Sequence, residues 1–594
     1  QIRMEPLVND RFRGTFTVTR LGRYLYTLRA WPAPFESWRK FVQKKLDVGQ
    51  EVSSELPTGV SLIQRCLPRA RGEDRAALEE LVERLLSAAL SVEEMAERIL
   101  DEGVARRVAG YPDHQTVVEY AKRLEVVVDP VRAGFSAWYE MFPRSYGTFR
   151  DCEAHLLYVA ELGFDIVYLP PIHPIGRTKR KGKNNALQCA FHDPGSPWAI
   201  GDRSGGHKAV HPELGTLQDF RRFVARAGEL GVDVALDIAF QCSPDHPWVA
   251  EHPEWFKQRA DGSIRFAENP PKKYEDIVPV DFETDDWQAL WAELESVFEF
   301  WVQQGVRIFR VDNPHTKPFA FWERTIGNLK HRHPDLIFLA EAFTRPKIMY
   351  RLAKLGFTQS YTYFTWRNTK WELQEYFAEL VQTQVREYFR PNLWPNTPDI
   401  LHEYLQTGGR PAFLARLVLA ATLGPNWGIY GAAFELCNRI PREPGSEEYL
   451  DSEKYEIKRW EIDREESLRR EIALINRIRR DNPALQRLVG LRFHGIDNEI
   501  LICYSKTAPD GDNTVLVVVS LDPYHTQSGW TDLSLEALGL AGNQAFQVRD
   551  LLSGARYTWN GKRNYVELNP SVMPAHVFRI ERGRGADADS PPPA

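Results

Sequence analysis

The chain has 594 residues, which is room for roughly three to five domains. Its 75 Lys and Arg residues against 81 Asp and Glu residues leave a net charge of −6 with both signs interspersed, which argues against a dedicated binder of nucleic acid or membranes. No segment approaches the roughly 18 consecutive apolar residues of a membrane span, so we expect none.

The cysteines and the first residues bear on the cellular compartment. Six cysteines stand at wide spacings with no Cys-x-x-Cys pair, which is typical of buried or free thiols in a reducing compartment. The segment from Gln1 to Pro6 contains no apolar signal-peptide region. We therefore expect a cytoplasmic protein.

The N-terminal segment mixes strand and helix patterns. Two runs of alternating β-branched and aromatic residues at 14–31 meet at Leu21-Gly22 and predict a hairpin in a β-sandwich. Further on, Leu and Ala recur at helical spacing, and Glu and Arg occupy the other face. These patterns predict an N-terminal β-domain over residues 1–130 that carries a helical insert at about 47–122.

Residues 131–490 alternate short apolar strand candidates with amphipathic helices. The strand candidates are 136–142, 165–169, 232–240, 306–312, 336–342, 361–366, 391–399 and 427–434. Eight such strands, spread over more than the minimal ~250 residues, predict an α/β fold, a (β/α)8 TIM barrel with insertions. In that fold the active site lies at the C-terminal ends of the strands.

Two long segments interrupt the barrel pattern directly after strands. Residues 172–211 and 241–286 are rich in Gly, Pro, Lys and His, and long loops at this end of a barrel usually build a substrate site. We expect the second to form a loop domain after the third strand. Short strand runs over 491–583 predict a C-terminal β-sandwich, and the low-complexity segment 584–594 predicts a disordered tail.

Three carboxylates are candidates for chemistry. Arg310 and Asp312 lie two apart on a strand and share a face, and a neighbouring Arg keeps an Asp ionised, as a nucleophile requires. Glu341 ends an apolar strand, where burial favours the protonated acid. Asp399 is placed at the end of another predicted strand. Taken singly, these residues also suit an ion pair, a strand terminus and an Asx turn.

Together the three carboxylates match the pair of acids used to cleave glycosidic bonds. The chain resembles glycoside hydrolase family 13, the α-amylase superfamily. The resemblance implies that Asp312 is the nucleophile, Glu341 the general acid/base, and Asp399 a residue that binds sugar hydroxyls and stabilises the transition state. It also implies that Asp237, in "VALDIAFQC", supports Arg310 at the floor of the site.

The departures from ordinary amylases are informative. Asn-His usually follows that aspartate and His precedes the last carboxylate, whereas this chain has Gln241-Cys242 and Pro398. These changes, with "RKGKNN", "GSPWAIGDRSGGH" and "ENPPKKYEDI", are similar to the maltose-1-phosphate maltosyltransferases of the GlgE type. Position 208 is Lys where that family suggests an acid.

This closer resemblance implies a phosphate cradle and a sugar grip. Lys, Asn and Tyr side chains are suitable donors to phosphate oxygens. The implied phosphate contacts are Asn269, Lys272, Tyr274 and Asn313. The implied contacts to the maltosyl unit are Lys181, Gln241 and Asp276, together with the pair Lys454 and Tyr455, although a solvated Lys on a helix is an alternative for Lys454.

The resemblance implies no cofactor. His207 and His211 lie four apart, but no cysteine or carboxylate motif at ligand spacing accompanies them, so we expect no metal site. The implied partners are α-maltose 1-phosphate and α-1,4-glucan or maltooligosaccharide acceptors, and a second copy of the chain in a homodimer.

The sequence thus predicts a retaining maltosyltransferase that forms a β-maltosyl-enzyme on Asp312. Another family-13 hydrolase or a 4-α-glucanotransferase would share the carboxylates and need no phosphate cradle. A catalytically inactive glucan-binding protein on the same fold is the alternative from another class.

Overall fold

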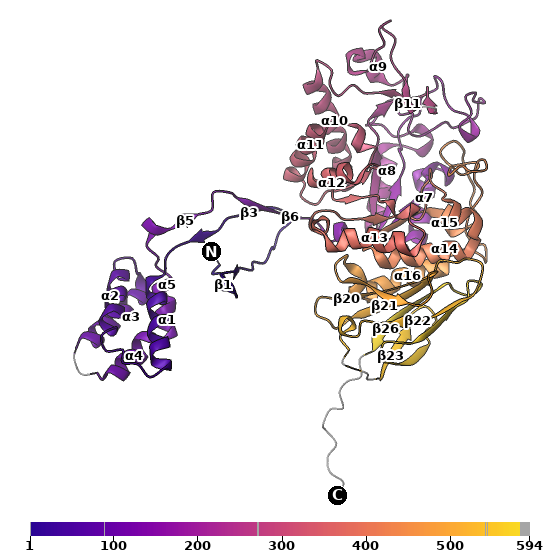
Figure 1. Cartoon of the computed structure of the whole chain (residues 1–594). Coiled ribbons are helices and arrows are strands. Elements are labelled where there is room, and N and C mark those ends of the chain that lie inside the picture. The colour runs from indigo at the N-terminus through magenta and orange to yellow at the C-terminus, as the bar shows by residue number, and fades with distance from the viewer. Residues whose placement is uncertain (1, 88–89, 270–271, 541, 543–544, 582–594) are drawn as a thin grey trace. The chain divides into compact units, whose positions relative to one another are not determined.

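A computed structural model describes residues 2–87, 90–269, 272–540, 542 and 545–581, except for the side chains of His114, Asn269 and Lys272. The expected tail at 584–594 lies outside these residues. The chain forms two compact units, one of residues 23–128 and one that combines residues 1–22 with 129–594. Figure 1 shows both units in chain colours.

The smaller unit is built around a helical bundle. Its helices are α1 (Pro34–Asp47), α2 (Leu56–Cys66), α3 (Gly72–Leu86), α4 (Val92–Leu100) and α5 (Glu102–Ala109). Their apolar faces meet in one core that includes Phe35, Trp38 and Val42. The helices begin at Pro34, before the expected start near 47, because apolar residues already recur at helical spacing there and Pro suits a first helical turn.

The N-terminal strands form three antiparallel pairs rather than the expected β-sandwich. The pairs are β1 (Glu5–Pro6) with β2 (Phe12–Arg13), β3 (Gly22–Tyr26) with β6 (Leu124–Val128), and β4 (Arg29–Ala30) with β5 (Val118–Glu119). The predicted hairpin at Leu21-Gly22 is therefore wrong. The strand that begins at Gly22 pairs with a segment about a hundred residues later, and a local pattern carries no information on such a partner.

The larger unit contains the barrel. Its eight parallel strands are β7 (Ser136–Glu140), β8 (Ile166–Leu169), β9 (Asp233–Ile238), β14 (Ile308–Asp312), β15 (Ile337–Glu341), β16 (Gln359–Ser360), β17 (Asn392–Leu393) and β18 (Asn426–Tyr430). They lie in chain order, and a bridge between Ser360 and Pro391 joins the two ends of the sheet. This confirms the predicted (β/α)8 barrel.

Helices cover the outside of this sheet. In chain order they are α7 (Phe149–Glu161), α8 (Leu217–Glu229), α10 (Trp287–Gln303), α11 (Phe319–Arg332), α12 (Pro346–Lys354), α13 (Lys370–Gln382), α14 (Glu403–Leu423), α15 (Gly431–Glu435) and α16 (Arg469–Asp481). The short α6 (Val131–Gly134) precedes the first strand, and its Ala133 belongs to the core inside the barrel. Alternate residues along the strands point outward, such as Phe309 and Phe338, and pack on these helices. The residues between them point inward, and Ile308, Leu339 and Tyr168 fill the inside of the barrel.

Two of the predicted barrel strands differ from the structure. Within the aromatic run at 361–366, Tyr363–Trp366 is a 3-10 helix, and the strand is the preceding pair Gln359–Ser360. The seventh strand ends at Leu393, so Asp399 lies in a turn rather than at a strand end.

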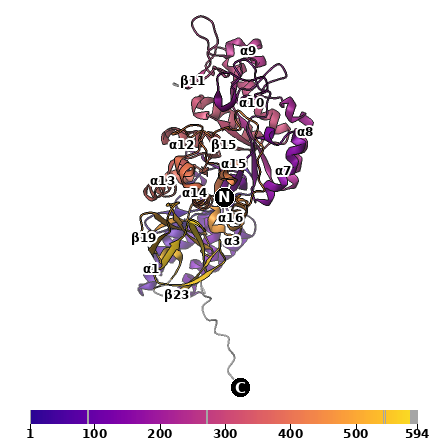
Figure 2. The same cartoon turned by 90° about the vertical axis from the view of Figure 1, so that its right-hand side faces the viewer.

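The insertion after β9 and the C-terminal region occupy opposite ends of the larger unit in Figures 1 and 2. The insertion contains β10 (Gln241–Cys242), α9 (Pro247–Glu251), β11 (Ala267–Asn269), β12 (Lys272–Tyr274) and β13 (Val278–Pro279). It connects the third strand to α10, as a loop domain would.

The C-terminal region is an eight-stranded antiparallel sheet. Its strands are β19 (Leu491–Ile496), β20 (Leu501–Thr507), β21 (Thr514–Ser520), β22 (Gln527–Asp532), β23 (Ala545–Asp550), β24 (Arg556–Asn560), β25 (Tyr565–Leu568) and β26 (Ala575–Glu581). Apolar side chains from seven of these strands, all but β22, enclose a second core that includes Leu516, Val548 and Val566.

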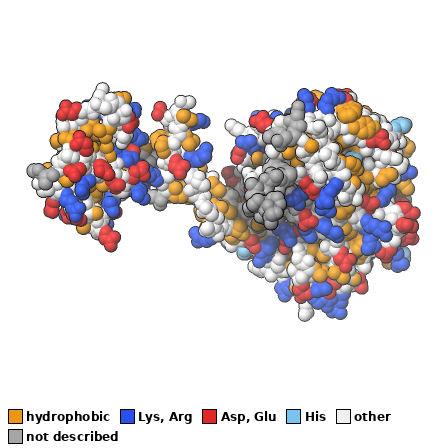
Figure 3. Space-filling model, turned by 90° about the horizontal axis from the view of Figure 1, so that it is seen from below, with side chains coloured by type: hydrophobic (Ala, Val, Ile, Leu, Met, Phe, Trp, Pro, Cys, Tyr) orange, Lys and Arg blue, Asp and Glu red, His pale blue; other side chains and the backbone are white. Residues whose placement is uncertain are grey.

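The surface matches the charge pattern of the sequence. In Figure 3, acidic and basic side chains are interspersed over the visible face of each unit. Among the described residues, no helix is both long enough and apolar enough to cross a membrane.

Candidate active site

A cavity of about 1060 Å³ opens at the C-terminal ends of the barrel strands. Most of the residues singled out in the sequence line it. These are Lys181, Gln241, Tyr274, Asp276, Arg310, Asp312, Asn313, Glu341, Asp399, Lys454 and Tyr455. Asp237 does not line the cavity and lies beneath it, while the side chains of Asn269 and Lys272 are outside the described part of the structure.

Strand register brings four charged residues together. In the ladder between β9 and β14, Asp237 is paired with Arg310, and between β14 and β15, Asp312 is paired with Glu341. Directly paired residues in parallel strands point to the same side, and so do residues two apart on one strand. All four side chains therefore point into the barrel at its C-terminal end.

Arg310 holds this group together. Its Nη1 donates to Asp237 Oδ2 at 2.8 Å and to Asp312 Oδ1 at 2.7 Å, and its Nη2 lies 3.7 Å from Glu341 Oε2. The side chains of Arg310, Asp237 and Asp312 are 9%, 0% and 10% exposed. The ion pair predicted from the sequence thus exists, and Arg310 extends it from Asp312 to Asp237 and Glu341. The hydroxyl of Tyr168 also donates to Asp237 Oδ2 at 2.6 Å.

The two paired carboxylates have opposite protonation tendencies. Burial raises the pKa of Asp312, but the positive charges of Arg310 and Lys317 outweigh burial, so the pKa of Asp312 lies below its ordinary value. Burial also raises the pKa of Glu341, to about 7, and the Asp312 charge adds to this rise while Arg310 opposes it. Neutral solution therefore favours an ionised Asp312 beside a partly protonated Glu341.

A sharp turn connects the two carboxylates. Asn313, directly after Asp312, has a left-handed backbone with φ of 43°, which Asn tolerates better than most residues. Its backbone N–H donates to Glu341 Oε2 at 3.0 Å, and its side-chain amide donates to Asp312 Oδ2 at 3.2 Å. Asn313 thus hydrogen-bonds both acids. The resemblance had implied only a phosphate contact for this residue.

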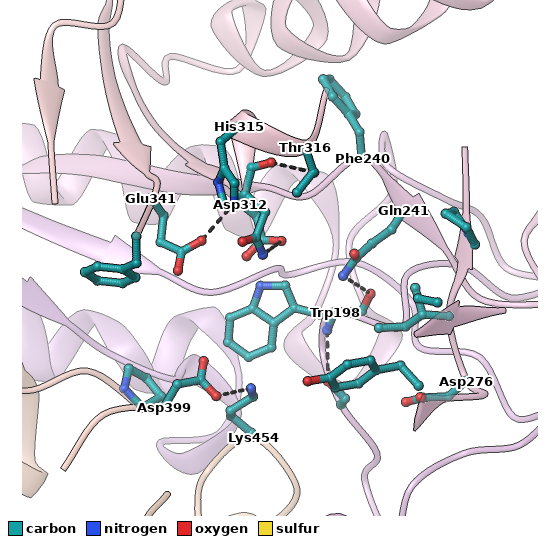
Figure 4. Close-up of a pocket in the computed structure, with 18 of the residues that line it drawn as sticks. Trp198, Phe240, Gln241, Asp276, Asp312, His315, Thr316, Glu341, Asp399 and Lys454 are labelled. Atoms are coloured by element: carbon teal, nitrogen blue, oxygen red, sulfur yellow. Dashed lines mark hydrogen bonds and ion pairs between the residues drawn. The ribbon is translucent and has the colours of Figure 1, made fainter. Parts of the chain in front are cut away.

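The third carboxylate approaches from another side of the cavity. Asp399 sits in the turn after β17 and forms an ion pair with Lys454, as Figure 4 shows. The Asp399 side chain is 52% exposed, whereas that of Lys454 is 17% exposed. The ammonium of Lys454 also lies 5.2 Å from the centre of the Trp198 ring. Lys454 is therefore held in the cavity wall rather than solvated on a helix.

The remaining predicted contacts lie toward the inserted loops. Lys181 and Asp276 are 3% and 2% exposed, and both oxygens of Asp276 are buried with no hydrogen-bond partner among the described residues. Burial raises the pKa of Asp276. Gln241 donates from its side-chain amide to the Trp198 carbonyl at 3.4 Å. Unpaired buried polar atoms beside a cavity indicate a polar ligand.

Sequence reasoning missed several residues that line the same cavity, among them Glu140, Trp198, Lys317 and Phe343. Glu140 ends an apolar strand just as Glu341 does, so the rule that found one could have found the other. It is 2% exposed, its Oε2 has no hydrogen-bond partner among the described residues, and burial raises its pKa well above the ordinary value. The aromatic residues carried no distinguishing signal within an aromatic-rich chain.

One buried cluster has metal-ligand chemistry, although it lies outside this cavity. Donor atoms of His207, Cys242 and His246 lie within 4.8 Å of one another. The Trp248 backbone N–H donates to His246 Nδ1 at 3.1 Å, so a neutral His246 carries its proton on Nε2, which faces His207 Nδ1 at 3.1 Å. His207 Nε2 lies 2.9 Å from the Ala239 carbonyl. All four ring nitrogens of His207 and His246 therefore take part in hydrogen bonds within the protein. This arrangement does not fit a metal site, because neither ring has a nitrogen lone pair left to bind an ion.

Two family models match the chain. "Alpha-1,4-glucan:maltose-1-phosphate maltosyltransferase, domain N/S" matches residues 1–130, and "GLGE, C-terminal" matches residues 493–580. Proteins named alpha-1,4-glucan:maltose-1-phosphate maltosyltransferase are similar over nearly the full length. That of Chlorobaculum tepidum is 55% identical and covers 97% of this chain and 88% of its own, and that of Myxococcus xanthus is 51% identical and covers 98% and 89%.

Solved structures of α-amylases share the fold. The maltogenic α-amylase AmyB of Thermotoga neapolitana superimposes with a TM-score of 0.58 at 20% identity, over 76% of this chain and 99% of that one. An α-amylase from Lactobacillus plantarum gives a TM-score of 0.56 at 21% identity, over 76% and 100%. At such identities the likeness shows the fold alone.

Proposed function

Since the chain belongs to the α-1,4-glucan:maltose-1-phosphate maltosyltransferase family, we propose that it moves maltosyl units from α-maltose 1-phosphate to the ends of α-1,4-glucans and releases phosphate. The observation that carries the residue assignment is the pairing of Asp312 with Glu341 across β14 and β15, with Arg310 bonded to Asp312.

In the first half-reaction, Asp312 attacks C1 of the donor while Glu341 gives a proton to the departing phosphate. The bond from C1 to the phosphate oxygen breaks, and an ester bond from C1 to the Asp312 carboxylate forms with β configuration. The low pKa of Asp312 and the raised pKa of Glu341 support these roles, because the nucleophile must be ionised and the acid protonated.

In the second half-reaction, Glu341 removes the proton from the 4-hydroxyl of the acceptor, whose oxygen then attacks C1 and releases Asp312. Two inversions retain the α configuration. Neighbouring paired strands lie about 4.8 Å apart, which supports the short separation, about 5–5.5 Å, that retaining enzymes use rather than the wider spacing of inverting ones.

The other residues bind the donor. Four residues are proposed to hold the phosphate. Three of them, Asn269, Lys272 and Tyr274, come from the hairpin of β11 and β12, and the fourth is Asn313, directly after β14. Lys181, Gln241, Asp276 and Tyr455 are proposed to hold the maltosyl unit. Asp399 and Lys454 are proposed to bind sugar hydroxyls as a pair, and Asp237 to brace Arg310 from below. The unpaired buried oxygens of Asp276 support a hydroxyl-rich ligand.

Incubation with α-maltose 1-phosphate and maltohexaose tests the proposal. We expect phosphate release together with products that are longer by two glucose units per step, because the transferred group is a disaccharide. Growth by single glucoses, or shortening without phosphate release, would instead indicate a 4-α-glucanotransferase or hydrolase of the same superfamily. An inactive glucan-binding protein would release no phosphate.

A homodimer is proposed on the basis of the N-terminal residues. None of the described side chains of residues 2–34 is buried, and Val8, Phe12 and Leu25 are 74%, 60% and 54% exposed. Exposed apolar side chains gathered in one segment are typical of protein–protein contacts. Light scattering coupled to size exclusion should give twice the chain mass, and a monomer at micromolar concentration contradicts the proposal.

A cytoplasmic location is proposed from the cysteines, all six of which are free thiols. Free thiols are typical of reducing compartments. Fractionation of native cells should recover the protein with cytoplasmic markers.

A further inference from the structure

Lys317 is a charged residue of the cavity wall for which neither the sequence resemblance nor the proposed mechanism supplies a role. It follows the short 3-10 helix Pro314–Thr316, which begins directly after Asn313. Its Nζ donates to the backbone carbonyl of Asn313 at 3.1 Å and to that of Asp312 at 3.3 Å. The Lys317 ammonium therefore binds the backbone of the same turn whose side chains and N–H groups contact both acids.

The charges around Lys317 are those of the reacting groups. Asp312, Glu341 and Asp237 attract its ammonium, and Arg310 repels it. In turn, Lys317 is second only to Arg310 among the positive charges that stabilise ionised Asp312. It also disfavours protonation of the neighbouring His315.

Other groups anchor the same turn without carrying charge. The Thr316 hydroxyl donates to the Asn313 carbonyl at 2.8 Å, and the Trp322 indole donates to the Pro314 carbonyl at 2.9 Å. These neutral bonds hold the turn without adding charge to it. Lys317 differs from them because it also bonds the backbone carbonyl of Asp312 itself, and because it adds positive charge beside both acids.

We propose that Lys317 is a positioning residue. Its ammonium clamps the turn of Asp312 and Asn313, and so holds the nucleophile and, through the Asn313 N–H, the acid/base in place for both half-reactions. This inference rests on the proposed function for the roles of the two acids, and it requires no contact between Lys317 and the substrate.

The test compares Lys317→Gln and Lys317→Arg with the wild-type enzyme, using both α-maltose 1-phosphate and α-maltosyl fluoride as donors. Loss of the charge should lower kcat about ten- to a hundredfold with either donor, because the acids move. KM for α-maltosyl fluoride should stay nearly unchanged, because Asn313, the donor contact within this turn, is proposed to bind the phosphate that the fluoride lacks. The acid limb of the kcat/KM profile should move up by about one pH unit, since Asp312 loses a neighbouring cation. Lys317→Arg should restore the position of that limb.

Lys330→Gln is the matched control. Lys330 is also a largely buried lysine in the larger unit, and its Nζ pairs with Asp129 at 2.6 Å. Its removal should lower Tm without moving the pH profile.

Two results would overturn the inference. If the pH profile and kcat of Lys317→Gln equal those of the wild type, the clamp has no role. If the loss appears only with the phosphate donor, Lys317 is a phosphate ligand instead. The fluoride donor also distinguishes these outcomes from failure of the proposed function. If the proposed function is wrong, the wild-type enzyme turns over maltosyl fluoride but releases no phosphate from maltose 1-phosphate.

Discussion

Arg310→Gln is the change that most directly perturbs the electrostatics of the site. It removes the guanidinium that bonds Asp237 and Asp312 at 2.8 Å and 2.7 Å and lies 3.7 Å from Glu341. Removing one partner of a buried ion pair costs about 3–5 kcal/mol, because the other charge stays buried. We expect this cost in full near pH 8, together with loss of activity.

The cost should depend on pH in a defined direction. Without Arg310, the folded-state pKa of Asp312 rises above its unfolded value, and the pKa of Asp237, which burial already raises to about 7, rises further. The native variant therefore binds protons that the unfolded chain releases. Stability from such groups is present at low pH and is lost as pH rises through the folded pKa. In the wild type, Arg310 and Lys317 already hold the pKa of Asp312 below its ordinary value. The stability deficit of the variant should therefore grow from pH 5 to pH 8.

Calorimetric Tm values at the two pH values measure this deficit, with two further variants for comparison. Arg310→Lys retains a charge and should show a smaller change with pH. Arg416→Gln removes a buried arginine whose hydrogen bonds within the described part of the chain go to the carbonyls of Phe364 and Arg367. Its deficit should change with pH only through His402, whose pKa is lowered by burial and by Arg416, and therefore less than the deficit of Arg310→Gln. An equal deficit for Arg310→Gln at pH 5 and pH 8 would refute the role of Arg310 as counter-ion to the carboxylates.

The remaining predictions concern activity. The pH profile of kcat/KM should be bell-shaped, because Asp312 must be ionised and Glu341, with a pKa raised to about 7, must be protonated. Since phosphate is a good leaving group, the alkaline limb should be weaker with a phosphate donor than with a donor whose leaving group is a sugar. Identical alkaline limbs for the two donors would count against Glu341 as the general acid. Tyr274→Phe should lower kcat/KM for maltose 1-phosphate about ten- to a hundredfold, as expected for one hydrogen bond to a charged group, and should change the reaction with maltosyl fluoride much less. Asp399→Asn should lower kcat about a hundredfold or more with little change in Tm, because we propose that this half-exposed side chain stabilises the transition state rather than the fold. A large fall in Tm together with the loss of activity would contradict this role.

The central strands could be predicted because their sequence pattern and their chemistry agree. The apolar runs that end in Asp312 and Glu341 have the length and composition of buried parallel strands, and adjacent strands of a barrel place their ends together. Register then follows from the fold, which is why Arg310 and Asp237 meet although they are 73 positions apart.

The misassigned elements fail for local reasons. The run Tyr363–Trp366 has high β-propensity, yet the Thr362 hydroxyl accepts from the Phe364 N–H at 3.3 Å and starts a 3-10 helix instead. The true strand, Gln359–Ser360, is polar because Gln359 donates to the carbonyls of Arg132 and Ala133 inside the barrel. A polar pair carries no strand signal in the sequence.

Trapping the covalent intermediate tests the account most directly. Glu341→Ala, given α-maltosyl fluoride without acceptor, should still form the glycosyl-enzyme, because fluoride needs little protonation to leave, and should hydrolyse it slowly without its base. Intact-mass spectrometry should show one added maltosyl unit, and peptide mapping should place it on Asp312. A maltosyl group on any other residue, or none under conditions where the wild type turns over the fluoride, would contradict the assignment of Asp312 as nucleophile.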